Sequence, residues 1–348
     1  MKYLVLLGDG MADEPLEDCG GKTPLQLSST PCMDGLARMG ELGLAQTIPE
    51  GMEPGSDVAN LSVMGYNPHD YYTGRAPIEA ASIGVQLAPT DIAFRCNLVT
   101  LREEAGALHM DDYSAGHIST ADAEAIIRAV KNELDSEDIR FYPGVSYRHL
   151  MVWQQGLEGI KTTPPHDITD QPVDAHLPRG DGAGKIRALM QQSRTLLAGL
   201  PLNKEKIDRG EKPVSSIWLW GQGKALKLPA FTATYGLSGS VISAVDLLKG
   251  LGISAGLSSI DVPGATGYLD TNYEGKVEAT LQALEAVDFV YLHVEAPDEA
   301  SHKGSRAEKI QAIEDFDAKI VRPVLDGCAK KFGACRIMVL PDHPTPLR

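Results

Sequence analysis

Three apolar runs of the chain are each followed by carboxylate or imidazole side chains that could bind a metal ion. The carboxyl ends of parallel strands meet at one edge of an α/β sheet, so these side chains are expected to lie close together. A mixture of carboxylate and imidazole ligands suits Zn²⁺, Mn²⁺ and related divalent ions. The candidate ligands are Asp9 after the run 3–7, Asp298 and His302 after the run 289–294, and Asp342 and His343 after the run 336–340.

Spacing and neighbours decide how strongly each of these residues points to a metal. Asp298 and His302 are four residues apart, so one helical turn would place both on the same side. A single aspartate after a strand, such as Asp9, is more often a helix cap or a turn residue than a ligand. Asp342 and His343 stand between a strand and two prolines, where neither has an evident capping role. Three such arrangements favour a metal site over three unrelated caps.

The segment PGSDVANLSVMGY at 54–66 holds a candidate nucleophile. Ser56 follows a glycine and precedes an apolar stretch that could begin a helix. A serine hydroxyl at a helix N-terminus beside a metal ion can lose its proton and attack phosphorus, and the helix amides stabilise the phosphate. Most Gly-Ser-Asp sequences are only helix caps, so spacing alone leaves both roles open. Ser62 is the weaker candidate because it lies deeper in the apolar run.

The elements that would position these residues follow from hydrophobic periodicity. Apolar strands alternate with helices from residue 217 onward, which is the pattern of a parallel sheet covered by helices. Residues 49–90 are predicted to be rich in loops and residues 160–185 to be irregular, and Trp218 and Trp220 to lie in the core. Helices are predicted after Thr30-Pro31 and Ser119-Thr120, over 276–286 and over 310–324, and strands over 3–7, 217–220, 240–245, 289–294 and 336–340.

Length, charge and cysteine content limit the classes of protein that fit. At 348 residues the chain exceeds the roughly 100–200 residues of one typical domain, so two domains are expected. A net charge of −15 argues against nucleic-acid or anionic-membrane partners. No apolar run reaches the ~18 residues of a membrane span, and the N-terminus lacks the features of a signal peptide. Five cysteines without a close CxxC pair indicate a reducing cytoplasm.

Seven segments form a set of motifs that extends over essentially the whole chain: GDGMAD, GKTPLQLSSTPCMDGLA, GSDVANLSVMGY, YYTGRAPIEAASIGV, VPGATGYLDTNYEGK, HVEAPDEASHKG and VLPDHPTP. Together they resemble the cofactor-independent phosphoglycerate mutases of the archaeal type, in the alkaline phosphatase superfamily. The resemblance implies an α/β fold with an alkaline-phosphatase-like parallel sheet core, helices on both faces, and an inserted α+β substrate domain. The core would comprise residues 1–90 and 215–348, and the insert residues 91–214.

The resemblance also implies a cofactor set and a catalytic serine. Members of the family use two divalent metal ions, commonly Mn²⁺, with Mg²⁺, Zn²⁺ and Co²⁺ as alternatives, and a serine that is transiently phosphorylated. Ser56 would be that serine. Two ions about 3.5–4 Å apart would hold the nucleophile and the transferring phosphoryl group. The ligands would be Asp9, Ser56, Asp342 and His343 for one ion, and Asp298 and His302 for the other.

Cationic side chains are candidates for binding an anionic substrate, because guanidinium binds phosphate and carboxylate in bidentate fashion. For any one arginine, a surface ion pair is the alternative. Related mutases place a basic residue near the nucleophile in the segment after the insert. Here that stretch is FTATYGL, where Thr234 or a neighbour stands instead, and Lys224 is a substitute. The candidate substrate-binding residues are Arg75, Arg95, His117, Arg148, His149, His166 and Lys224.

The implied reaction is the glycolytic interconversion of 3-phosphoglycerate and 2-phosphoglycerate through a phosphoserine. Ser56 would take the phosphoryl group, the glycerate would reorient without leaving, and its other hydroxyl would take the group back. A homoserine kinase-like phosphotransferase or a phosphatase on the same scaffold is the alternative, and a non-catalytic metal-binding relative is a second one. The partner would be a small phosphorylated substrate, and the oligomeric state stays open.

The C-terminal end bears on the second metal position. The chain stops five residues after His343, whereas family members continue into a segment with another metal-ligating histidine. Within this sequence, Asp298 and His302 would be the ligands of that ion, fewer than the three protein ligands of a typical catalytic zinc-type site. We therefore expect this position to bind its ion weakly, unless another residue such as His293 serves as a ligand.

Overall fold

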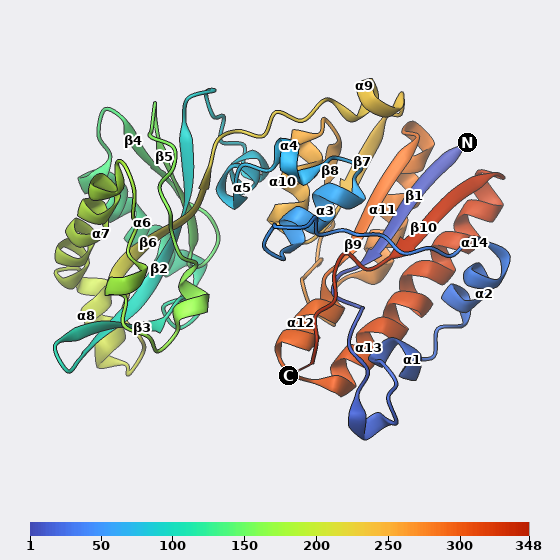
Figure 1. Cartoon of the computed structure of the whole chain (residues 1–348), viewed down its shortest axis with the longest axis horizontal. Helices are drawn as coiled ribbons and strands as arrows, with labels where there is room; N and C mark the ends of the chain where they lie inside the picture. Colours follow the sequence, from blue (N-terminus) through green and yellow to red (C-terminus); the bar gives the residue numbers. More distant parts are fainter. Residues whose placement is uncertain (348) are drawn as a thin grey trace. The chain divides into compact units, whose positions relative to one another are not determined.

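A parallel five-stranded sheet carries the predicted metal ligands in the computed structural model, which describes residues 1–347 (Figure 1). Its strands are β1 (Lys2–Gly8), β7 (Gly239–Ile242), β8 (Ser258–Ile260), β9 (Phe289–Val294) and β10 (Cys335–Leu340). They lie in the order β10-β1-β9-β7-β8, and every pairing along this order is parallel. The inner strands β1, β9 and β7 are apolar runs with largely buried side chains, as expected of strands covered on both faces. The predicted parallel α/β core is confirmed.

The register of this sheet aligns the ends of three neighbouring strands. Leu7 of β1 lies opposite Leu340 of β10 and opposite His293 of β9. Asp9 and Asp342 therefore leave the sheet at the same edge, and so does the segment that follows β9. This is the edge at which parallel α/β sheets bind ligands.

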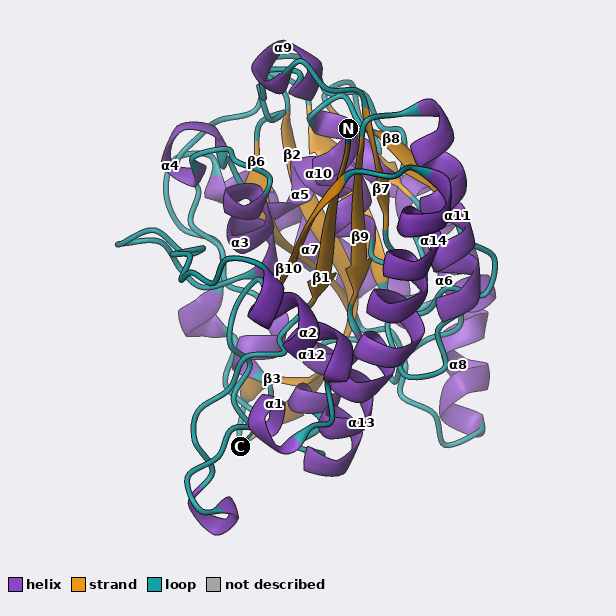
Figure 2. Cartoon of the chain, turned by 90° about the vertical axis from the view of Figure 1, so that its right-hand side faces the viewer, coloured by secondary structure: helices purple, strands orange, loops and turns teal. Residues whose placement is uncertain are grey.

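Helices cover both faces of the sheet (Figure 2). They are α1 (Pro24–Leu27), α2 (Pro31–Met39), α3 (Ser56–Val63), α4 (Pro68–Tyr71), α9 (Phe231–Tyr235), α10 (Asp246–Ser254), α11 (Tyr273–Ala286), α12 (Ala296–His302), α13 (Arg306–Phe316) and α14 (Arg322–Lys331). Helix α10 contacts α3 and β7, and α11 contacts β9 and α14. The long helix predicted over 310–324 is continuous, but a π-helical segment at Asp317–Val321 joins α13 to α14.

The chain divides into two compact units, Met1–Tyr72 with Lys227–Arg348 and Thr73–Leu226. The second unit is built on an antiparallel sheet of β2 (Ile92–Glu104), β3 (Ala107–Asp112), β4 (Ile139–Tyr142), β5 (Arg148–Trp153) and β6 (Ser216–Gly223). Its helices are α5 (Arg75–Ser82), α6 (Thr120–Leu134), α7 (Ala183–Ala198) and α8 (Pro201–Asp208). The insert predicted at 91–214 is shorter than this unit because α5 and β6 both pack on β2.

Two local predictions are wrong. The strand at 217–220 exists, but it is part of β6 and pairs antiparallel with β2 rather than joining the parallel sheet. Hydrophobic periodicity identifies a strand without naming its partner. The stretch 49–90 is less irregular than predicted, because it holds α3, α4 and α5. These helices have only four to eight residues, too few for a clear periodic signal. Among residues 1–347, no helix has the length and apolarity needed to cross a membrane.

Candidate active site

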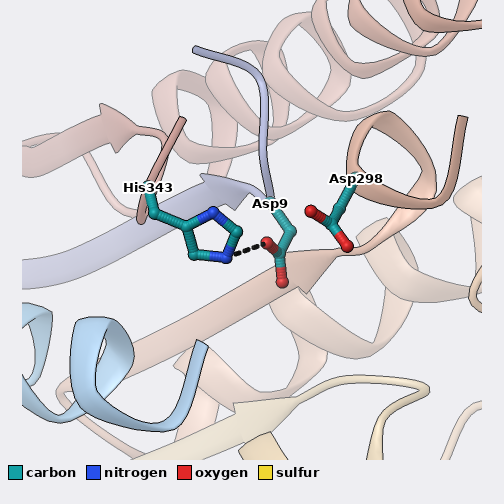
Figure 3. Close-up of side chains that lie close together, drawn as sticks. All are labelled: Asp9, Asp298 and His343. Atoms are coloured by element: carbon teal, nitrogen blue, oxygen red, sulfur yellow. Dashed lines mark ion pairs between the residues drawn. The ribbon is translucent and has the colours of Figure 1, made fainter. Parts of the chain in front are cut away.

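Four of the predicted ligands meet at the edge of the parallel sheet, and Figure 3 shows three of them, Asp9, Asp298 and His343. Asp9, Asp298 and His343 each offer a ligand atom, and these atoms lie within 4.8 Å of one another. His343 Nε2 is 3.4 Å from Asp9 Oδ1 and 3.5 Å from Asp342 Oδ2. Asp9, Asp298 and Asp342 are all buried. The structure therefore brings together side chains that are more than 280 residues apart in the chain.

A glycine allows this close approach. Gly10 follows Asp9 with a φ of +62°, a conformation that favours glycine. A Cβ atom at this position would lie 2.6 Å from Asp298 Oδ1 and 2.8 Å from Asp298 Cα. The Gly-Asp-Gly sequence after β1 thus lets α12 lie directly against the end of the strand.

Ser56 is the first residue of α3, and its hydroxyl points at the same cluster. Ser56 Oγ lies 3.1 Å from His343 Nε2. The first amides of a helix have no partner inside the helix, and the helix dipole favours an anion at this end. A nucleophile here would accept a phosphoryl group at a position where free N–H groups can bind the phosphoryl oxygens.

The charges of the cluster are unbalanced. Burial raises the pKa of the Asp9 carboxyl well above its ordinary value of 3.8, and the charges of Asp342 and Glu295 raise it further. Asp9 Oδ1 is buried and receives no hydrogen bond within residues 1–347. A divalent cation would compensate the repulsion and would use this free oxygen. The donor set of carboxylates, imidazole and hydroxyl fits Mn²⁺, Zn²⁺ or a related ion.

Asp298 and His302 form a pair within α12, as their four-residue spacing predicts. His302 Nε2 lies 3.2 Å from Asp298 Oδ2, and this hydrogen bond raises the pKa of His302. The His302 side chain is 67% exposed, whereas Asp298 is 8% exposed. Thr345 Oγ1 donates a hydrogen bond of 2.5 Å to Asp298 Oδ1. Asp298 is therefore the member of the pair that reaches the buried cluster.

The second unit has a cluster of its own, made of cationic and aromatic side chains. Arg95 on β2 lies with its guanidinium 4.3 Å from the centre of the Trp220 ring, and its Nε is 2.9 Å from Glu79 Oε2. Arg75 Nε is 3.1 Å from the other oxygen of Glu79. Burial lowers the pKa of Arg95 to about 10, and the charges of Arg75 and Arg148 lower it further while Glu79 opposes them. Glu79 thus forms ion pairs with two guanidinium groups, and the charge of Arg148 is close enough to lower the pKa of Glu79 as well.

Aromatic contacts extend this cluster to two histidines. The ring of Tyr113 lies 6.4 Å from that of His117 and 6.0 Å from that of His166. Tyr147 contacts Tyr113 and His117, and the Arg148 guanidinium lies 5.4 Å from the Tyr147 ring. We call this set the cationic cluster: Arg75, Arg95, His117, Arg148 and His166 with Tyr113, Tyr147 and Trp220. Trp218 and Trp220 are buried as predicted, yet Trp220 also forms one wall of the cluster.

Two of the candidate substrate-binding residues lie outside these contacts. His149 is buried, and its Nδ1 accepts a hydrogen bond from the Gly144 amide. Burial lowers the pKa of His149 to about 4, so it is neutral near pH 7. Lys224 forms an ion pair with Glu158. Thr234 is exposed on α9, and its hydroxyl donates to the Ala230 carbonyl.

Several polar residues beside the candidate ligands were not predicted from the sequence as site residues. Asn60 lies one turn after Ser56 on α3 and donates to Asp342 Oδ2 over 2.8 Å. Tyr291 and Ser243 are buried beside the cluster, and the sequence indicates His293 only as a substitute ligand. The four-residue spacing from Ser56 to Asn60 and the two-residue spacing from Tyr291 to His293 are signals that could have found three of them.

Replacing Asp9 with asparagine is expected to stabilise the metal-free protein. Asparagine removes one buried negative charge and keeps an oxygen where the carboxylate was. We expect a gain of about 2–4 °C in melting temperature for each kcal/mol of repulsion removed. A carboxyl with a raised folded pKa loses stability as the pH rises above its unfolded value, so the gain should grow as the pH rises from 3.8.

Thermal unfolding of dialysed protein at several pH values measures this effect. Asp326→Asn makes the same change of charge at an exposed position of α14 and is the matched control. If Asp9→Asn unfolds at a lower temperature than the wild type at pH 8, the cluster is not a repulsive one.

The chain is similar in sequence to known phosphoglycerate mutases. A sequence model of a family described as 2,3-bisphosphoglycerate-independent phosphoglycerate mutase matches residues 37–203. The chain is 57% identical to a Geobacter sulfurreducens protein named "Probable 2,3-bisphosphoglycerate-independent phosphoglycerate mutase", over 100% of this chain and 87% of that protein. A Methanothrix thermoacetophila protein with the same family name is 54% identical, over 100% of this chain and 87% of the relative.

A solved structure gives the same result. The cofactor-independent phosphoglycerate mutase from Thermoplasma acidophilum superimposes with a TM-score of 0.61 and 28% identity, covering 99% of this chain and 87% of that one. The fold and the resemblance predicted from the sequence motifs are thus confirmed by independent comparisons.

Proposed function

The chain belongs to the 2,3-bisphosphoglycerate-independent phosphoglycerate mutases, a family of metal-dependent isomerases, and we propose that it transfers the phosphoryl group by way of Ser56. Its reaction is the interconversion of 3-phosphoglycerate and 2-phosphoglycerate. The role of Ser56 is supported by the position of its hydroxyl, which lies 3.1 Å from His343 Nε2 and beside the buried carboxylates.

The proposed metal ligands are those that the resemblance implies. Two divalent ions, Mn²⁺ by preference, would be held by one set around Asp9 and by another around Asp298. When bound, such ions lower the pKa of a serine hydroxyl and neutralise charge on a transferring phosphoryl group. The sets are Asp9, Ser56, Asp342 and His343 for one ion, and Asp298 and His302 for the other.

The residues of the chain then act in two steps. Ser56 Oγ attacks the phosphorus of 3-phosphoglycerate, the bond from phosphorus to the C3 oxygen breaks, and the serine proton ends on that oxygen. In the second step the C2 hydroxyl attacks the phosphorus of the phosphoserine, the bond from phosphorus to Ser56 Oγ breaks, and the hydroxyl proton ends on Ser56 Oγ. The N-terminal amides of α3 stabilise the phosphoryl oxygens in both steps.

The cationic cluster is proposed to bind the anionic groups of the substrate. Arg75 and Arg95 form ion pairs with Glu79, and the two histidines and Arg148 of the cluster are exposed. Guanidinium groups bind carboxylate and phosphate through paired hydrogen bonds. His149 and Lys224 are weaker candidates in this proposal, because His149 is buried with its Nδ1 bonded to the Gly144 amide and Lys224 is paired with Glu158. Location in the reducing cytoplasm stays a prediction from the cysteine content.

Replacing Arg148 with alanine is expected to weaken the binding of phosphoglycerate without reducing metal content. Loss of a charge-assisted contact of about 1.5–3 kcal/mol should raise KM or lower kcat/KM by roughly 10–100-fold. Arg128→Ala on α6, which removes an exposed arginine paired with Glu124, is the matched control. Steady-state kinetics together with metal analysis measures both quantities, and unchanged kinetics would show that Arg148 is a surface ion-pair residue only.

An activity screen of the purified protein with Mn²⁺ tests the proposed function. Conversion of 3-phosphoglycerate to 2-phosphoglycerate without added 2,3-bisphosphoglycerate is the expected result. Homoserine with ATP, and a general phosphomonoester, are assayed in parallel. Activity on either of these without mutase activity would overturn the assignment in favour of a kinase or a phosphatase. Absence of all three activities in metal-loaded protein would favour a non-catalytic relative.

A further inference from the structure

We propose that two side chains on one face of β9, Tyr291 and His293, are positioning residues that orient the carboxylates of Asp342 and Asp9. The proposal rests on the metal centre described under the proposed function and deepens it. Residues two apart on a strand point to the same face, so β9 presents both side chains to the cluster. Both are completely buried, and neither is among the ligands that the family resemblance implies.

The first chain of hydrogen bonds runs from Tyr291 through Asn60. The Tyr291 hydroxyl donates to Asn60 Oδ1 over 2.5 Å. Asn60 Nδ2 donates to Asp342 Oδ2 and to the backbone carbonyl of Ser56, both over 2.8 Å. The carboxylate and the carbonyl can only accept, so the amide nitrogen must face them and the amide oxygen must face Tyr291. Tyr291 thereby fixes the amide that ties the nucleophile's backbone to Asp342.

The second chain runs from Ser243 through His293 to Asp9. Ser243 Oγ lies 3.0 Å from His293 Nδ1, and His293 Nε2 lies 2.8 Å from Asp9 Oδ2. Ser243 Oγ already accepts the Val245 amide, so its own hydrogen is available for Nδ1. Within residues 1–347, no other acceptor for that hydrogen is found. His293 therefore carries its proton on Nε2 and donates it to Asp9.

These two chains have one structural effect. Asp9 Oδ2 is held by His293, and the same carboxylate keeps Oδ1 without a hydrogen bond on the side of His343. Asp342 is held by Asn60 at Oδ2 and by the Gly10 and His343 amides at Oδ1. Repulsion between the buried carboxylates would otherwise turn them apart. Fixed ligand orientation reduces the cost of assembling a metal site.

Asp9, His293 and Glu295 could also be read as a cation site, since their ligand atoms lie within 4.8 Å of one another. The geometry favours positioning instead. His293 Nε2 is occupied by its proton and by Asp9, and Lys276, whose Nζ donates to the His293 carbonyl, supplies a positive charge beside it. A lysine at this point disfavours a second cation.

Variants that remove single contacts test the proposal. Tyr291→Phe and Ser243→Ala each remove one oxygen, and His293→Leu removes both ring nitrogens. His293→Gln keeps an N–H donor near the position of Nε2. Ser240→Ala, a buried serine on β7 outside both chains, is the matched control. Mn²⁺ affinity is measured by titration calorimetry, and kcat and KM by steady-state kinetics, on protein whose fold is checked by circular dichroism.

We expect Tyr291→Phe and His293→Leu to bind Mn²⁺ about 10–100-fold more weakly, with a lower kcat and an unchanged KM for 3-phosphoglycerate. Ser243→Ala should show the same change at smaller size, and His293→Gln should recover most of the loss. If His293→Leu does not fold, the Mn²⁺ affinities of Tyr291→Phe and Ser243→Ala decide whether the positioning proposal holds. A lower Mn²⁺ stoichiometry in His293→Leu with unchanged affinity for the remaining ions would overturn positioning in favour of a cation site.

Asp9→Asn separates this proposal from the one on which it rests. If Asp9→Asn binds Mn²⁺ as tightly as the wild type, the metal centre itself is misplaced. If Asp9→Asn loses Mn²⁺ while Tyr291→Phe and His293→Leu bind it as tightly as Ser240→Ala, the metal centre stands and the positioning proposal fails.

Discussion

Replacing Ser56 with alanine is expected to lower mutase activity by about 10⁴-fold or more, because the proposed mechanism forms its phosphoserine on this hydroxyl. The hydroxyl lies at the start of α3, so its removal should leave the fold and the binding of 3-phosphoglycerate intact. Ser62→Ala is the matched control, since Ser62 lies in the same helix. Steady-state rates with saturating Mn²⁺ and substrate measure the effect.

The covalent intermediate gives a second measurement on the same residue. Protein quenched in acid during turnover should carry phosphate on the peptide that contains Ser56. Phosphate on Ser62, or a Ser56→Ala protein that retains more than about one hundredth of the wild-type rate, would show that another group accepts the phosphoryl group.

Removing divalent ions with a chelator is expected to lower activity by about 10³-fold or more, and Mn²⁺ should restore it. Charge neutralisation by metal ions contributes several kcal/mol to the transfer of a phosphoryl group. The same treatment should lower the melting temperature, because ions that bind only the folded protein stabilise it. Activity assays and thermal unfolding, before and after addition of Mn²⁺, measure both effects.

Asp9→Asn makes this experiment specific. The variant should stay inactive after Mn²⁺ is added back, and its melting temperature should respond little to the ion. Full activity of the dialysed wild-type protein, with a metal content below one ion per ten molecules by elemental analysis, would contradict a metal-dependent mechanism.

The proximity of these candidate ligands was predictable because strand ends are visible in a sequence. Asp9 and Asp342 each follow an apolar run, and strands of a parallel sheet end on a common edge. Leu7 pairs with both His293 and Leu340 in the observed register, so the residues that follow these strand ends lie close together. The roles of these residues as ligands stay proposals, whereas the fold that carries them is confirmed.

The residues that form hydrogen bonds to the candidate ligands were harder to predict, because they lie in buried segments whose composition is that of a core. Tyr291 and His293 lie in an apolar strand, where their composition fits a core strand as well as a functional one. Only the three-dimensional contacts to Asn60 and Asp9 distinguish the two. The strand at 217–220 shows the same limit in another form. Its partner β2 lies more than 100 residues earlier, and nothing in its own composition specifies that pairing.

Among the candidate substrate-binding residues, the type of side chain does not predict its location in the fold. Arg95, Arg148 and His166 are far apart in the sequence, and their convergence depends on aromatic rings from three different segments. His149 is adjacent to Arg148, yet it is buried, whereas Arg148 at the start of β5 is exposed. A choice based on residue type alone could not tell these neighbours apart.

The pairing of β1 with β9 and β10 also constrains how the protein folds during its synthesis. The first strand to leave the ribosome has partners that begin at residues 289 and 335, so it stays unpaired until most of the chain has been made. The unit Thr73–Leu226 closes entirely on its own segments and can fold earlier. A nascent chain arrested near residue 260 should therefore hold a protease-resistant 73–226 fragment behind an N-terminal segment that is still open to cleavage.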